Sequence, residues 1–168
     1  MTLLDAPAFD EARDRRRQIM LYSGGGLLLL LFIIFWLVSG RPVDWPWSWY
    51  THLAGRSAAN HFLQAVEQND LPKAYAIWLH DPDWQKHPDK YRAYPYARFE
   101  GDWSRTSSDN EYGVISSHEI VAARVYHNVL LLGVLINGRK SKALFLTYFP
   151  KEHTLNFAPP DEELYLGP

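Results

Sequence analysis

The densest group of side chains that could bind a metal ion lies in one short stretch. It consists of His80, Asp81, Asp83 and His87, and imidazole and carboxylate groups are common zinc ligands. The polar loop that holds them, residues 80–90, contains two prolines, Pro82 and Pro88, and aspartate beside proline is typical of turns. We therefore interpret these residues as turn formers and expect no metal site.

Candidate residues for acid–base catalysis form a less distinct group in the sequence. His118 and Glu119 are adjacent, and four tyrosines could line a cavity with them: Tyr75, Tyr96, Tyr126 and Tyr148. General acid–base catalysis needs groups within hydrogen-bond reach of the reacting atoms, and no spacing here singles out an acid–base pair. The sequence therefore predicts no catalytic residue in this group.

Nucleophilic chemistry is not indicated either. Ser107, Ser108 and Ser116 do not stand in a Gly-x-Ser-x-Gly turn, the setting that exposes a nucleophilic serine in many hydrolases. The chain has no cysteine, which excludes thiol nucleophiles, disulfides and Cys-based zinc sites. We expect no cofactor.

Length and charge narrow the remaining classes of function. The chain has 168 residues and a formal net charge of -2, and no run of Lys or Arg follows Gly40, so nucleic acid is not an expected partner. Aromatic residues make up 15% of the chain. This content favours a dense aromatic core, with an aromatic binding surface as the alternative.

Residues 19–40 contain no charged side chain. At 1.5 Å per residue they give a helix of roughly 33 Å, against a hydrocarbon core of about 30 Å. We predict a transmembrane helix here. A cleaved signal peptide with Ser39 and Gly40 at the cleavage site is the alternative. The length of the apolar run, the missing A-x-A pattern and Pro42 argue against it.

Arginines precede this span. Since Lys and Arg flanking a span stay on the cytoplasmic side, they predict a cytoplasmic tail over residues 1–18 and an extracytoplasmic, periplasmic C-terminal domain on a single-pass protein of the cell inner membrane. A twin-arginine export signal at Arg16-Arg17 is the alternative. The topology residues are Arg13, Arg15, Arg16 and Arg17.

Small residues occur together inside the span. Ser23, Gly24, Gly25 and Gly26 would let a neighbouring helix approach closely, because they place little side chain between two backbones. They predict a helix-packing face, and the alternative is a local irregularity of the helix. The span offers no ionisable group for a proton or ion path.

Aromatic residues follow the span within residues 41–56. Trp and Tyr concentrate at the membrane interface, so we interpret this segment as an interfacial linker and prefer that to a ligand-stacking platform. The interface residues are Trp45, Trp47, Trp49 and Tyr50.

Residues 57–157 are expected to form one α+β domain of two to three helices on a curved antiparallel sheet. Helical spacing and caps predict the helices, whereas β-branched runs and the Asn137-Gly138 turn signal predict the strands. The expected helices cover 57–69, 71–78 and 94–103, and the strands 114–126, 129–136, 139–149 and 154–157.

The last residues, 158–168, form an acidic, proline-rich tail. Leu164, Tyr165 and Leu166 could dock on a partner, and the alternative is a frayed end.

This order of elements resembles the nuclear transport factor 2-like fold, a cystatin-like α+β cone. The resemblance covers about 57–157 and implies either a scaffold or a cone with an internal acid–base pocket, as in ketosteroid isomerase. A membrane-anchored layout of this kind is similar to the inner-membrane assembly component of type IV secretion. The residues that carry the resemblance to the nuclear transport factor 2-like fold are AANHFLQAV at 58–66, Asn69-Asp70, Ala74-Tyr75, Tyr96-Ala97-Arg98-Phe99, Asp102-Trp103 and the strands around Asn137-Gly138.

These features favour an accessory or assembly subunit of a larger membrane complex, of respiratory, photosynthetic or secretion type, that acts by protein contact. Its expected partners are membrane lipid and other subunits. One alternative is a membrane-tethered small-molecule-binding or enzymatic cone. Another is a structural protein that forms homo-oligomers through its span.

Overall fold

The computed structural model describes residues 11–158, and the chain divides into two compact units between Val38 and Ser39. The first unit contains helix α1 (Glu11–Val38), which is long and apolar enough to cross a membrane. The helix starts before the predicted span and carries the four arginines in its first turns. It ends before Gly40, whose φ of +87° suits glycine because that residue has no Cβ.

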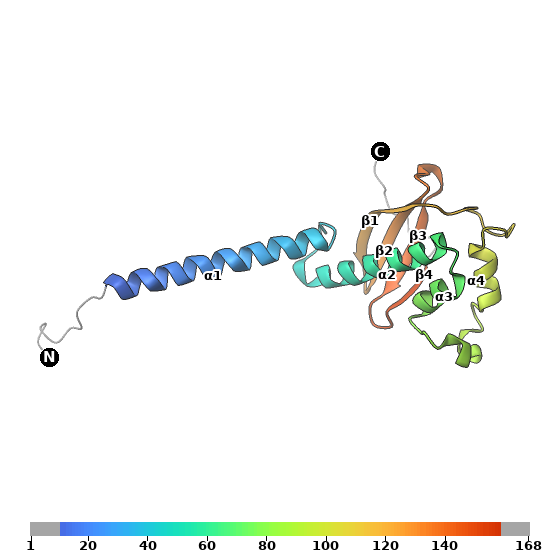
Figure 1. The fold of residues 1–168 in the computed structure, drawn as a ribbon, viewed down its shortest axis with the longest axis horizontal. Helices are drawn as coiled ribbons and strands as arrows, with labels where there is room; N and C mark the ends of the chain where they lie inside the picture. Colours follow the sequence, from blue (N-terminus) through green and yellow to red (C-terminus); the bar gives the residue numbers. More distant parts are fainter. Residues whose placement is uncertain (1–10, 159–168) are drawn as a thin grey trace, which may run out of the picture. The chain divides into compact units, whose positions relative to one another are not determined.

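The second unit is an α+β domain, which confirms the predicted fold class (Figure 1). Helices α2 and α3 pack against each other, and α2 also contacts the sheet. The order of its elements is η2 (Pro46–Ser48), α2 (Trp49–Glu67), α3 (Leu71–Leu79), η3 (Trp84–Lys86), η4 (Pro88–Tyr91), α4 (Tyr96–Trp103), β1 (His118–Tyr126), β2 (Val129–Ile136), η5 (Lys140–Lys142), β3 (Leu144–Phe149) and β4 (Thr154–Phe157).

The four strands form one antiparallel meander in the order β1-β2-β3-β4, so β1 and β4 are its edges. Residues 127–128 join β1 to β2, because Tyr126 pairs with Val129. The β1 register shifts between Ile120 and Ala122. Such a bulge bends an edge strand and frees backbone groups from the ladder.

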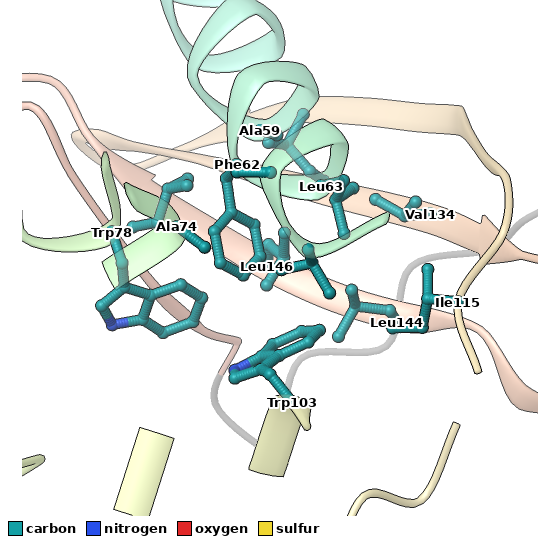
Figure 2. Close-up of a cluster of buried hydrophobic side chains, with 14 of the residues drawn as sticks. Ala59, Phe62, Leu63, Ala74, Trp78, Trp103, Ile115, Val134, Leu144 and Leu146 are labelled. Atoms are coloured by element: carbon teal, nitrogen blue, oxygen red, sulfur yellow. The ribbon is translucent and has the colours of Figure 1, made fainter. Parts of the chain in front are cut away.

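An aromatic core fills the space between the helices and the sheet (Figure 2). The Phe62 ring lies 5.1 Å from that of Trp78 and 5.0 Å from that of Trp103, measured between centroids. Leu144 and Leu146 of β3 complete the same cluster. Six aromatic residues are buried in this core, Phe62, Tyr75, Trp78, Phe99, Trp103 and Tyr148, so a dense aromatic core is present as predicted.

Local sequence signals account for two helix starts. The Asp70 side chain accepts a hydrogen bond from Lys73 N and caps α3, with Pro72 in its first turn, as expected for an N-cap aspartate. Pro95 is the N-cap of α4 and is extended, with φ -71° and ψ 159°, so the helix begins at Tyr96 and not at the predicted residue 94.

The start of α2 corrects the sequence analysis. The helix begins at Trp49 rather than Ser57, so part of the predicted linker is helical. Gly55, which falls in the predicted linker, is buried against the sheet, where a Cβ would lie 2.6 Å from Leu130 Cδ2. Trp49 itself is only 5% exposed. Trp49 therefore belongs to the domain and is not a membrane-interface residue.

The predicted tight turn at Asn137-Gly138 is confirmed, because Arg139 N donates to Ile136 O over 3.0 Å, but the predicted start of the returning strand at residue 139 is wrong. Both residues have positive φ, but β3 starts only at Leu144, after η5. The Asn137 amide oxygen accepts hydrogen bonds from the backbone N–H groups of Ser116 and Ser117. The asparagine thus anchors the lead-in to β1, and this side-chain pairing explains why β1 begins at His118 instead of Val114.

The predicted docking residues Leu164, Tyr165 and Leu166 lie outside the described part of the chain.

Candidate functional site

Two of the hollows on the surface of the second unit are large enough for a ligand or a partner segment. We call the first the α2–α3 groove and the second the arginine cleft. The groove has a volume of about 850 Å³ and the cleft about 570 Å³. Both lie within the size range of ligand sites.

The α2–α3 groove has a floor of small and apolar side chains from two neighbouring helices. Its rim is polar and cationic and, among the described residues that line it, contains no carboxylate. The lining residues are Ala54, Ser57, Ala58, His61, Gln64, Ala65, Gln68, Lys73, Ala76, Ile77, His80, Pro82, Tyr148 and His153.

One end of the groove is closed by an aromatic group. The Tyr148 hydroxyl lies 2.8 Å from His153 Nδ1, and the His80 and His153 rings lie 5.2 Å apart. Burial raises the pKa of Tyr148, so the phenol stays protonated and can donate to the imidazole at neutral pH. Tyr148 and His153 therefore line the groove as a hydrogen-bonded pair.

The arginine cleft is built from three segments: residues 40–44, the nearby helix α2, and residues 121–124 of β1, which are distant from both in sequence. Residues 40–44 run along the edge strand β1, and α2 forms the opposite wall. The lining residues are Gly40, Arg41, Pro42, Val43, Asp44, His52, Arg56, Val121, Ala122, Ala123 and Arg124.

Asp44 holds the linker segment in place. Its Oδ2 atom lies 2.8 Å from His52 Nε2 and accepts a hydrogen bond of 3.3 Å from Val125 N on the open edge of β1. His52 is 1% exposed, and its Nδ1 has no hydrogen-bond partner among the described residues. The carboxylate therefore stabilises both a buried imidazole and a strand edge.

Asp81, one of the four predicted turn formers, stabilises a turn as expected. Asp81 accepts hydrogen bonds from Asp83 N at 2.9 Å and from the Tyr91 hydroxyl at 2.6 Å. The Tyr91 hydroxyl is the main reason that the pKa of Asp81 is lowered. His80 points instead to His153. Within residues 11–158, no three His, Asp or Glu side chains form a group that could hold a metal ion.

The His118-Glu119 candidate is not brought together as an acid–base pair. His118 contacts α2, with Nδ1 2.7 Å from Glu67 Oε1 and Nε2 3.1 Å from Asn60 Oδ1. These contacts tie the start of β1 to α2. The four tyrosines do not line one cavity: Tyr75 is 1% exposed inside the core, with the Tyr96 ring 5.5 Å away, whereas Tyr126 is 41% exposed.

The serine candidates serve as turn residues. Ser107 Oγ accepts a hydrogen bond from Asp109 N, and Ser116 Oγ donates to Asn137 Oδ1. Ser108 Oγ lies 3.4 Å from Asp109 Oδ1. None of these hydroxyls has a histidine partner among these contacts.

The predicted membrane-related residues stay open to a neighbour. Around Gly24, Gly25 and Gly26, a Cβ would meet no atom within 4 Å. Trp45 and Trp47 are 72% and 81% exposed, and their rings stack 5.6 Å apart. Tyr50 is exposed as well.

Sequence analysis missed both hollows. The groove had a signal, because Ala54, Ala58 and Ala65 recur at helical spacing on α2. The cleft had none, since Arg41, Arg56 and Arg124 are brought together only by the tertiary fold.

Comparison of the chain with protein-family models, with curated proteins and with solved structures gave no match.

Proposed function

We propose that this chain is a membrane-anchored accessory or assembly subunit that binds another protein through the α2–α3 groove. The observation that carries the proposal is the groove itself, an open hollow of about 850 Å³ with an apolar floor. Small side chains on neighbouring helices allow a third helix to approach closely, and amphipathic helices commonly occupy such grooves. The lining lysine, Lys73, and the lining histidines favour a partner segment with acidic residues beside its apolar face.

The anchor supports this role. Helix α1 has the length and composition of a membrane span, and its Gly24–Gly26 face has no side chain to block a neighbouring helix. A subunit of a membrane complex would use both elements, with the span packing in the bilayer and the groove docking outside it. The arginines before the span favour an N-terminus in the cytoplasm and a periplasmic domain.

The order of three helices followed by an antiparallel meander supports a nuclear transport factor 2-like domain. Enzymes of that fold need a polar group in an open interior. Here the space between helices and sheet is occupied by Phe62, Trp78, Phe99 and Trp103, each 3% exposed or less. This packing favours the scaffold use of the fold over the enzymatic one.

The test is affinity purification of the full chain from its native membrane in mild detergent. We expect a stoichiometric partner that is lost with Ala58→Arg, which fills the groove, and with Lys73→Glu, which reverses a charge on its exposed rim. Ala97→Arg, on the exposed face of α4, is the matched control and should keep the partner. A monomeric wild type without a partner, or full retention by both groove variants, would contradict the proposal.

Self-association is separated by a second measurement. Disulfide crosslinking of Gly25→Cys would give a covalent dimer if identical spans pack on their glycine faces. A crosslinked dimer that keeps no other subunit would instead favour the structural homo-oligomer.

A further inference from the structure

The arginine cleft concentrates positive charge in a confined volume. Arg41, Arg56 and Arg124 line it, each from a different segment, and Asp44 is the one acidic residue among its described lining residues. The Asp44 carboxylate is already engaged by His52 and Val125 N. The three guanidinium groups therefore outnumber the negative charge available to balance them.

Arg56 is fixed in position at the inner end of the cleft. Its side chain packs on Gly40, where a Cβ would lie 2.7 Å from Arg56 Nε. One terminal nitrogen donates to Ile120 O, at the bulge in β1, over 3.3 Å. A guanidinium has five N–H donors, so donors remain for a ligand. Burial also lowers the pKa of Arg56, which shows that its charge is partly removed from water.

A phosphate group matches this site. Planar guanidinium groups bind phosphate oxygens through paired N–H bonds, and an anion offsets the cost of a partly buried cation. We propose that the arginine cleft binds the phosphate of an anionic phospholipid headgroup. Arg41 and Arg124 are exposed and would contact the phosphate from the open side.

The source of the phosphate follows from chain connectivity. Gly40 lines the cleft and follows the end of α1, Val38, by two residues, a path of about 7 Å at most. The exposed Trp45 and Trp47 rings come directly after the cleft segment, as expected for residues at headgroup level. The lipid source thus rests on the proposed membrane anchoring by α1, whereas the phosphate chemistry rests on the cleft alone.

The test places the full chain in nanodiscs that contain equal amounts of phosphatidylglycerol and phosphatidylcholine. Native mass spectrometry then measures which lipid each protein retains. We expect wild type to retain phosphatidylglycerol preferentially and the Arg41→Gln/Arg124→Gln variant to lose that preference roughly tenfold, as for a lost charged hydrogen bond. Both substitutions are at exposed positions, so the fold is kept. Arg139→Gln/Lys151→Gln, also exposed, makes the same charge change elsewhere and should behave as wild type.

A second arm titrates inorganic phosphate into the chain in pure phosphatidylcholine nanodiscs and follows the thermal midpoint. A rise in wild type alone, without phosphatidylglycerol enrichment, would support the phosphate site and overturn its lipid source. Absence of both effects, or equal effects in the cleft and control variants, would overturn the site. A chain that fails to enter nanodiscs would contradict the anchor, and the phosphate titration in detergent would still decide the cleft.

Discussion

Helix α2 borders both hollows, and the two differ in composition and in construction. The α2–α3 groove uses two helices that follow each other in the chain, and its floor is apolar. The arginine cleft joins residues 40–44 and α2 to residues 121–124 of β1, and its character is ionic. One helix therefore presents one surface suited to a protein segment and another suited to a small anion.

Because the two hollows use different residues of α2, each can be altered independently of the other. His52 and Arg56 face the cleft, whereas Ala54, Ala58 and His61 line the groove. A substitution on one side leaves the other lining intact, unless it moves α2 itself. Variants can therefore be ordered by whether they disturb the helix, the cleft or the groove.

The largest effect is expected from Gly55→Val, which should disturb both hollows. A Cβ at this position would lie 2.6 Å from Leu130 Cδ2 and 2.9 Å from Tyr148 Cδ1, so α2 must move away from the sheet. Overpacking of this kind costs about 1–3 kcal/mol. Urea unfolding should show this loss. Gly101→Val is the control, because a Cβ there meets nothing closer than 3.8 Å. Equal stability of the two variants would show that α2 does not depend on this close approach.

Much of the fold was predictable because its signals are local. Caps and prolines placed α3 and α4, and the aliphatic run of β2 gave its observed bounds, Val129–Ile136. The errors arose where a residue had a distant partner. The linker was predicted to extend to residue 56 because the contact of Gly55 with the sheet is tertiary, and the first strand was predicted to start at Val114 because the bonds of Asn137 to Ser116 and Ser117 are not visible in the sequence.

The hollows were less predictable for the same reason. Periodicity identifies the buried face of a helix, but it does not state which partly covered face will meet another helix. The alanines of the groove were therefore assigned to packing in general. Arg124 of the cleft is far in sequence from Arg41 and Arg56, and only the tertiary fold, through β1 and the course of residues 40–44, brings the three together.

A smaller effect, confined to the cleft, is expected from Asp44→Ala. The substitution removes the partner of His52 Nε2 and of Val125 N, so the free energy of unfolding should fall by about 1 kcal/mol. Phosphatidylglycerol retention should also fall, because residues 40–44 lose their attachment to β1. Partner binding in the groove should stay unchanged. Asp44→Asn keeps an oxygen acceptor and should lose less. An equal loss of stability in both variants would show that charge, rather than hydrogen bonding, holds this segment.

The smallest effect, confined to the groove wall, is expected from Tyr91→Phe. Its hydroxyl is the main group that lowers the pKa of Asp81, and Asp81 lies between the groove residues His80 and Pro82. A carboxyl whose pKa is lower in the folded than in the unfolded chain stabilises the fold above its unfolded pKa of about 3.9, and loses that effect as pH falls through the lower, folded value. Wild type should therefore exceed Tyr91→Phe in thermal midpoint at pH 7, and the gap should narrow as the pH falls below about 4. Lipid retention by the arginine cleft should stay unchanged. A gap that is the same at pH 7 and pH 3 would show that Tyr91 stabilises the loop through ring packing and not through the Asp81 carboxylate.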